Sequence, residues 1–184
     1  MNLKKEAHIV LSQFSMTLEG IELGAAVTEG LVLDILGKPD RVEQGTPPAP
    51  AGHRNNEVYF FDSYGIYWIR HHKTLLMTTL GLVLHPDLGN PLQRHTRVQF
   101  SGWLQLLDSR IDCRTTVNDL TEAVRDRIRP RLGTWWAGHV GGHDVTFQVA
   151  VSHGSPGAIM DMEIGFGKPL LDDGGGDAAH SARS

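Results

Sequence analysis

The sequence predicts an α+β fold in which short helices pack on an antiparallel β-sheet. Two threonine-capped apolar helix patterns occur along the chain, and strand-like runs separated by turn residues follow each of them. The 184 residues are 40% hydrophobic and 21% charged, which is enough apolar material to fold without a disulfide or a metal ion. The chain is therefore expected to form one domain, or two small units that share a core.

The first helix is expected to begin after Thr28. A threonine hydroxyl at this position accepts a hydrogen bond from an unpaired amide of the first helical turn. Apolar residues then recur with helical spacing at Leu31, Val32, Ile35 and Leu36. Gly37 tolerates a left-handed cap and Pro39 cannot continue a helix, so the helix has about three turns at most.

Three antiparallel strands are expected after this helix. Residues 44–56 contain three prolines and two glycines without apolar periodicity, which is typical of a mobile loop. Residues 58–62 and 66–70 are aromatic and β-branched runs separated by a Ser-Tyr-Gly turn, and a third apolar run covers 75–84. Because short turns join these runs, they predict a meander.

The second half of the chain repeats this order loosely. Residues 14–18 (FSMTL) are echoed by residues 100–104 (FSGWL). Thr116, with Asp119 three residues later, forms a variant of the capping box at the start of a second helix. Helical spacing then continues until Pro130 ends it.

Two more strands and a polar tail complete the predicted order. Strands are expected at 145–151 and 159–166, around a Gly- and Pro-containing turn. The repeated order predicts two tandem units, 1–95 and 96–170, followed by a disordered glycine-rich tail over 171–184. The alternative is that such short matches arise by chance.

No arrangement of residues in the sequence is typical of a catalytic site. His139 and His143 have i, i+4 spacing, but the double glycine between them disfavours the helix that would point both imidazoles at one metal ion. His71 and His72 lie between two predicted strands, and Cys113 is a lone cysteine. We therefore predict a protein that is not an enzyme and has no cofactor or metal ion. A metal- or small-ligand-binding protein and a hydrolase that uses clustered histidines are the alternatives.

The aromatic strands hold the residues that we expect to bind a partner. Large apolar side chains occur on both faces of these strands. One face is expected to pack on the helices, which leaves the other face exposed for a partner. Tyrosine and tryptophan are favoured anchors in protein interfaces. A sheet buried on both faces is the alternative. The candidate partner-binding residues are Glu57, Tyr59, Phe61, Asp62, Tyr67, Trp68 and Trp135.

Charge and hydropathy restrict the expected partners and compartment. A net charge of -4 gives no preference for nucleic acid, and the four arginines between 125 and 131 are suited to the negative end of a helix dipole. No apolar run approaches the roughly 20 residues that span a bilayer. The N-terminus lacks the apolar region of a signal peptide, and a single cysteine suits a reducing compartment. We predict a cytoplasmic protein that binds neither nucleic acid nor membrane, with its oligomeric state left open.

Several motifs resemble a family of small binding modules. They are 20–24 (GIELG), 36–40 (LGKPD), 64–67 (YGIY) and 100–104 (FSGWL). The order of a helix, LGKPD, a loop and aromatic strands with YGIY resembles the repeat unit of β-lactamase-inhibitor-like proteins and of small outer-membrane assembly lipoproteins. GIELG, LGKPD and FSGWL are similar to motifs of uncharacterised bacterial proteins, some of which neighbour polymorphic toxins. The chain departs from the lipoprotein branch because it has no lipid-acceptor cysteine near its N-terminus.

The resemblance implies a non-enzymatic protein-binding module with a helix layer on an antiparallel sheet. The expected function is that of an immunity protein, which neutralises a bacterial toxin by covering its active site. Exposed aromatics would supply apolar burial, while Glu57 and Asp62 would pair with a basic toxin surface.

Overall fold

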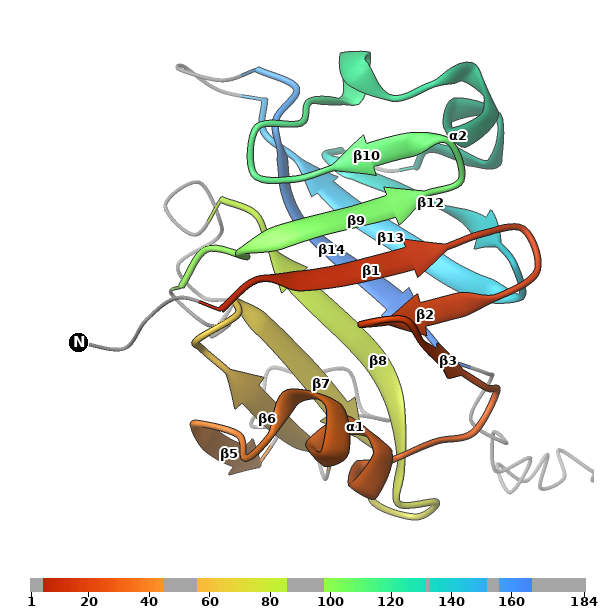
Figure 1. Cartoon of the computed structure of the whole chain (residues 1–184). Helices are drawn as coiled ribbons and strands as arrows, with labels where there is room; N and C mark the ends of the chain where they lie inside the picture. Colours follow the sequence, from red (N-terminus) through yellow and green to blue (C-terminus); the bar gives the residue numbers. More distant parts are fainter. Residues whose placement is uncertain (1–4, 45–55, 86–97, 132, 152–155, 167–184) are drawn as a thin grey trace, which may run out of the picture.

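Two β-sheets pack face to face in the computed structural model, with the smaller sheet in front of the larger one in Figure 1. The structure describes residues 5–44, 56–85, 98–131, 133–151 and 156–166. Buried side chains from both sheets form one core cluster between the layers. Most of the predicted 44–56 loop and the whole predicted tail lie outside the described residues.

The smaller sheet has five strands, in the order β10 (Ser109–Ile111), β9 (Gly102–Leu106), β1 (Ala7–Leu11), β2 (Met16–Leu18) and β3 (Ile21–Leu23). β1 lies in the middle, parallel to β9 and antiparallel to β2. Side chains alternate across a strand, so Ala7, Ile9 and Leu11 of β1 all point into the core. The sequence patterns did not predict this sheet.

The larger sheet has nine strands, and all of its pairings are antiparallel. The main order is β11 (Ile128–Pro130), β12 (Trp135–Val140), β13 (His143–Val149), β14 (Ile159–Gly165), β8 (Leu76–Val83), β7 (Ile66–Arg70), β6 (Glu57–Phe61) and β5 (Arg41–Gln44), while β4 (Val27–Thr28) pairs with β8. The predicted meander is confirmed in β6, β7 and β8, and the two later strands are confirmed in β13 and β14.

The first helix, α1 (Glu29–Leu36), has the predicted caps. The Thr28 hydroxyl accepts a hydrogen bond from the amide of Leu31 at 3.3 Å. Gly37 adopts a left-handed φ of 83° and its amide donates to the carbonyl of Leu33. Val32 and Leu36 are the buried residues of the helix, so packing compensates for its short length.

The second predicted helix is divided. A short 3₁₀ helix, η2 (Val117–Asp119), precedes α2 (Glu122–Arg127), and the predicted capping box of Thr116 and Asp119 is present. The expectation of one helix up to Pro130 is wrong, because Leu120 is extended and residues 128–130 pair with β12. Sheet pairing satisfies these backbone groups and overrides a weak helix propensity.

The α+β prediction is confirmed for the antiparallel sheet and the short helices, but the balance was wrong: the fold is mostly β. Helices of eight and six residues cannot cover a nine-stranded sheet. They lie at opposite ends of the sandwich (Figure 1), and the smaller sheet supplies the facing layer.

Both halves of the chain contribute to each sheet. β1 pairs with β9 in the smaller sheet, and β8 pairs with β14 in the larger one. Residues 1–95 and 96–170 therefore share one core.

Candidate binding surface

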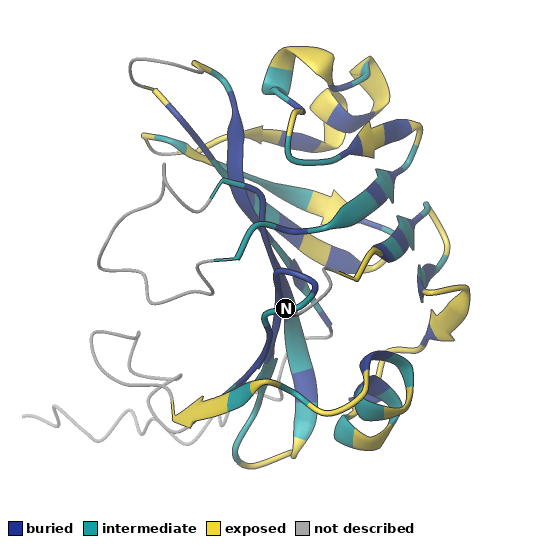
Figure 2. Cartoon of the chain, turned by 60° about the vertical axis from the view of Figure 1, so that its left-hand side comes forward, coloured by how far each residue is buried: buried dark blue, intermediate teal, exposed yellow. Residues whose placement is uncertain are grey.

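Three predicted partner-binding residues lie in the core between the two sheets. Tyr59, Phe61 and Trp68 are all buried there, and Trp68 has an exposed fraction of 0%. Figure 2 shows buried residues, in dark blue, along strands of the sandwich. The ring of Trp68 packs on Phe166 with centroids 5.2 Å apart. The expected exposure of these side chains is wrong because the smaller sheet belongs to the same core.

Tyr67 lies on the opposite face of the larger sheet and is also buried, with an exposed fraction of 1%. It clusters with Phe60 and Val83, and its hydroxyl donates to Glu163 Oε1 at 2.6 Å. Burial, and then the charge of Glu163, raises the pKa of Tyr67 well above its usual value. The ring covers Gly81, where a Cβ would lie 1.9 Å from Tyr67 Cζ. At this position the sheet is buried on both faces.

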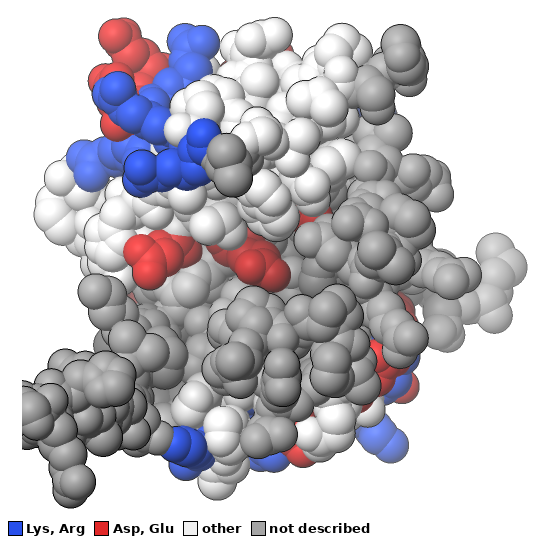
Figure 3. All heavy atoms as spheres, turned by 180° about the vertical axis from the view of Figure 1, so that it is seen from behind, with Lys and Arg blue, Asp and Glu red and all other residues white. Residues whose placement is uncertain are grey.

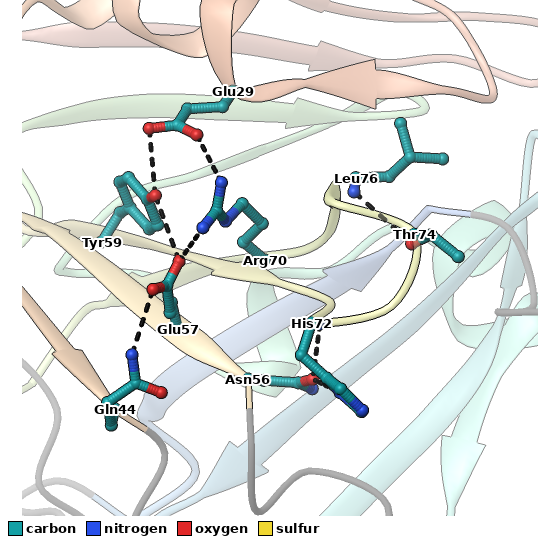
Figure 4. A network of polar contacts seen from close by, with 9 residues as sticks. All are labelled: Glu29, Gln44, Asn56, Glu57, Tyr59, Arg70, His72, Thr74 and Leu76. Atoms are coloured by element: carbon teal, nitrogen blue, oxygen red, sulfur yellow. Dashed lines mark hydrogen bonds and ion pairs between the residues drawn. The ribbon is translucent and has the colours of Figure 1, made fainter.

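Glu57 belongs to a polar network between α1 and the larger sheet (Figure 4). Arg70 pairs with Glu57 and donates from Nη1 to Glu29 Oε2 at 2.7 Å. The Tyr59 hydroxyl donates to Glu29 Oε1 at 3.0 Å. Burial, and next this hydrogen bond, raises the pKa of Tyr59 to about 12. The network holds α1 on β6 and β7, so these carboxylates are already paired inside the molecule.

Asp62 is also paired within the chain. Arg41 Nε donates to Asp62 Oδ2 at 3.3 Å, and the Arg41 guanidinium lies 3.5 Å from the ring centroid of Phe60. Trp135, at the start of β12, has an exposed fraction of 37%. Of the five predicted aromatic residues, Trp135 alone reaches solvent with a substantial part of its surface.

The histidine pairs have other contacts. His143 Nδ1 lies 3.2 Å from the carbonyl oxygen of Gly165, and burial lowers the pKa of His143. The rings of His71 and His72 lie 4.9 Å apart. Within the described part of the chain, no three His, Cys, Asp or Glu side chains are grouped so that they could hold a metal ion.

An acidic pair lies on the outer face of the larger sheet, where acidic atoms appear in the middle of Figure 3. Asp161 and Glu163 alternate on β14 with Met162, which belongs to the core. Burial, and then the charge of Glu163, raises the pKa of Asp161 to about 7. Asp161 opposes Gln148 on β13, and Gln148 Oε1 is buried without a hydrogen-bond partner among the described residues.

An open groove of about 450 Å³ lies at the end of the sandwich where α2 is found. The β1–β2 turn, the β9–β10 turn and α2 meet there, on the right of Figure 1. Its lining residues are Ser12, Gln13, Phe14, Leu107, Asp108, Ala123 and Arg127.

Phe14 is the most exposed large apolar residue in the described ranges, at 89%. Its backbone is nevertheless well ordered by hydrogen bonds: Ser12 Oγ accepts from the amides of Phe14 at 3.2 Å and Ser15 at 3.0 Å, and the Ser12 amide donates to the Ser15 carbonyl. Gly141 packs against the same turn, since a Cβ there would lie 2.3 Å from the Ser12 carbonyl oxygen. The turn is held in place while the Phe14 ring stands in solvent.

The opposite wall of the groove combines apolar and charged groups. Leu107 adopts a left-handed φ of 54°, which is uncommon for a residue with a Cβ. Asp108 accepts a hydrogen bond from the Thr121 hydroxyl. Arg127 is exposed and forms no ion pair with any other residue that the structure describes.

Sequence reasoning did not select Phe14, Leu107 or Arg127 as binding residues. The available signal was the phenylalanine itself, a large apolar side chain between Gln13 and Ser15 in a polar, turn-forming segment.

Comparison of the chain with models of protein families, with curated proteins and with solved structures gives no match in any of the three. Among the described residues, no helix has the length and apolar character needed to cross a membrane.

Proposed function

We propose that this protein is a non-catalytic protein-binding module that acts as an immunity protein and neutralises a bacterial toxin by covering its active site. The observation that carries the proposal is Phe14, a solvated aromatic on a hydrogen-bonded turn at the rim of an open groove. The motifs that resemble toxin-neighbouring proteins suggest the kind of partner.

Phe14 has the properties of a preorganised interface anchor. Burying a phenylalanine side chain in an interface contributes roughly 1.5–3 kcal/mol. Because Ser12 already restrains the turn, little backbone freedom is lost when a partner covers the ring. The adjoining groove can receive a side chain from the partner, which is the usual arrangement around an interface hot spot.

The proposed contact surface differs from the one that the sequence suggested. Glu57 and Asp62 are paired with Arg70 and Arg41, so recruiting them to a partner would break internal ion pairs. The groove around Phe14 binds a partner without that cost. When the turn is bound, the two sheets behind it would cover the active site of the toxin.

We also infer that the two halves are related copies. Each has a hairpin in the smaller sheet, then a helix, then four antiparallel strands of the larger sheet. In the first half, Thr28 of β4 pairs with Leu76 of β8. In the second half, Thr116 forms the corresponding antiparallel bridge with Ala158, which directly precedes β14. The hairpin turns place Glu19 and Leu107 at φ values of 53° and 54°. An experimental structure whose two halves differ in strand order would contradict this inference.

The proposed function is tested with the proteins encoded by the genes on either side of this one, each first expressed alone to find whether it is toxic. Co-expression is expected to restore growth, and the purified pair is expected to bind in titration calorimetry. Phe14→Ser should weaken binding by about tenfold or more, the effect of losing roughly 1.4 kcal/mol or more.

Val42→Ser is the matched control, because Val42 is an apolar residue with 46% exposure on β5, at the far edge of the larger sheet. It should leave binding within about twofold, which is the scale of a surface change of a few tenths of a kcal/mol. Binding no tighter than to an unrelated protein, or equal losses in the two variants, would refute the proposal.

A further inference from the structure

The two outer faces of the sandwich differ in exposure. On the larger sheet, Phe60, Tyr67 and Asp161 point away from the inter-sheet core and are nevertheless buried. On the smaller sheet, which is the front layer in Figure 1, every strand residue that points away from the core is at least partly exposed. We call this surface the open face. Its residues are His8, Val10, Thr17, Glu22, Trp103, Gln105 and Arg110.

Five of these residues form one row across the open face. Gln105 of β9 lies beside Arg110 on one neighbouring strand and beside Val10 on the other. Thr17 continues the row next to Val10, and Glu22 ends it on β3. Because neighbouring strands lie about 4.8 Å apart, the row is roughly 19 Å long. It has a cation at one end, a carboxylate at the other and an apolar residue in the middle.

Trp103 stands beside this row, and its ring is held in place. His8 on β1 stacks on the ring with centroids 5.1 Å apart, and the Arg110 guanidinium on β10 lies 5.3 Å from the ring centroid. Since β1 and β10 flank β9, the ring is supported from both sides. A tryptophan restrained in this way loses little freedom when a partner covers it, so it is suited to anchor an interface.

Carboxylates outnumber cations on the open face and at its border. Among the described residues, the carboxylates are Glu6, Glu19, Glu22 and Asp112, and the cation is Arg110. The excess is therefore three negative charges. Glu6 and Glu19 each lie 3.8 Å from a ring nitrogen of His8, and Glu22 is exposed without an ion pair to any residue that the structure describes. These three carboxylates lie on the β1–β3 side, away from Arg110 at the β10 edge.

We propose that the open face binds a basic surface of a partner protein, with cationic side chains over the β2–β3 carboxylates and an apolar side chain against Trp103 and Val10. The inference rests on the proposed function, because it gives the toxin a basic surface and adds a second contact surface to the groove. It keeps the charge that the sequence suggested for the toxin but moves the pairing carboxylates to the smaller sheet. Apolar groups at the centre and charged groups at the rim are the usual arrangement of a protein interface.

Other occupants fit the open face less well. A second copy of the chain would bring the same excess of carboxylates against this one, which costs free energy. Nucleic acid would meet the same repulsion. A metal ion needs ligands gathered around one point, and the described part of the chain has no group of three His, Cys, Asp or Glu side chains that could hold one.

The test adds two synthetic ten-residue peptides to the full-length ¹⁵N-labelled chain. Both contain one phenylalanine, one leucine and four glycines, together with four lysines in one peptide and four glutamates in the other. The basic peptide is expected to shift amide signals at 8–10, 17–22 and 103–105. It should bind at least about fivefold more tightly than the acidic one, which a few exposed ion pairs can supply. Raising the salt concentration should reduce this difference, because salt screens exposed charges.

Glu22→Lys is expected to weaken binding of the basic peptide about fivefold. Asp144→Lys is the matched control, because Asp144 is an exposed carboxylate on the outer face of the larger sheet. It carries the same charge change and should alter binding by less than about twofold. Trp103→Ala should also weaken binding about fivefold or more, while Trp103→Phe keeps an aromatic ring and should retain most of the affinity.

Arg110→Glu gives a result that loss of folding cannot imitate. Arg110 opposes a basic partner, so reversing its charge should tighten binding of the basic peptide about threefold. Arg131→Glu is the matched control, because Arg131 is an exposed arginine that follows β11 at the edge of the larger sheet. It should change binding by less than about twofold.

Equal binding of the two peptides, signal shifts away from the smaller sheet, or equal effects of Glu22→Lys and Asp144→Lys would overturn the inference. Weaker binding by Arg110→Glu, or unchanged binding by Trp103→Ala, would do the same. Shifts of the same amides when the protein is concentrated alone would identify a second copy as the occupant. Tighter binding of calcium chloride at these amides would identify a metal site, and both outcomes overturn the proposal.

The two proposals fail separately. If no neighbouring protein is both toxic and bound but the peptide results hold, the immunity function fails and the chemistry of the open face stands. If the toxin binds wild type, Glu22→Lys and Trp103→Ala equally well, the open face fails as a contact surface and the function stands.

Discussion

Asp161→Asn should stabilise the protein at neutral and alkaline pH and leave its stability almost unchanged in acid. Asp161 lies on β14 with an exposed fraction of 8%, beside Glu163 on the same face. Burial, and then this neighbouring charge, raises its pKa to about 7. A hydrogen bond from the backbone of the opposing Gln148 acts in the other direction and lowers this pKa, but it is the smallest of the three contributions.

The sign of the effect follows from proton binding. The ordinary pKa of the carboxyl is 3.8, so between about pH 4 and pH 7 the folded state holds a proton that the unfolded state has lost. The stability contributed by Asp161 is therefore complete below pH 3.8 and declines as the pH rises toward 7. A rise of about three pKa units corresponds to roughly 4 kcal/mol at pH 8. Asparagine stays neutral and avoids this loss.

Urea unfolding at pH 4, 6 and 8 measures the effect as the difference between Asp161→Asn and wild type. We expect a difference near zero at pH 4 that grows to as much as about 4 kcal/mol in favour of the variant at pH 8. Subtracting the free energy of unfolding of wild type from that of the variant removes the opposing contribution of His143. The lowered pKa of His143 makes the folded protein more stable as the pH rises. Asp144→Asn on β13 is the control, because its side chain is 69% exposed. An Asp161→Asn variant that loses stability at pH 8, or gains equally at all three pH values, would refute the reasoning.

Three further substitutions test the packing. Gly81→Ala should cost about 1–3 kcal/mol of unfolding free energy, because its Cβ would overlap the Tyr67 ring; an unchanged urea midpoint would contradict this. Leu75→Gly should raise the free energy of unfolding by about 1 kcal/mol, since this exposed residue has a left-handed φ of 57°; a loss in urea unfolding would show that Leu75 is not strained. Arg70→Met should lower the free energy of unfolding by about 2 kcal/mol in the same assay, because it leaves Glu57 and Glu29 without their cation. An unchanged free energy of unfolding would mean that this network does not stabilise the fold.

Local features of the fold were predictable from the sequence. The Thr28 cap, the left-handed Gly37 and the Thr116 capping box appeared where short-range patterns placed them. These features depend on hydrogen bonds within three or four residues, so the sequence neighbourhood contains all their partners. The meander of β6, β7 and β8 was predictable for the same reason, because short turns join its strands.

The smaller sheet was not predictable, because its central strand depends on distant pairings. β1 takes its place between β2 and β9, and Ile9 lies opposite Leu104, although residues 9 and 104 are far apart in the sequence. The local pattern of residues 7–11 contains no information about β9. Because the smaller sheet was not predicted, the aromatic strands were wrongly expected to have an exposed face. Trp68 would be exposed only if this second layer were absent.

The sequence by itself determined the turn chemistry, the helix caps, the alternation of the aromatic strands and the excess of arginine near α2. Only the tertiary structure decided which of those side chains reach solvent. The burial of a residue depends on the layer that packs against it. Each of the two sheets contains strands from both halves of the chain, so this layer is often formed by distant residues. The same long-range pairing brings Glu163 to the hydroxyl of Tyr67, and brings Phe14, Leu107 and Arg127 around one groove.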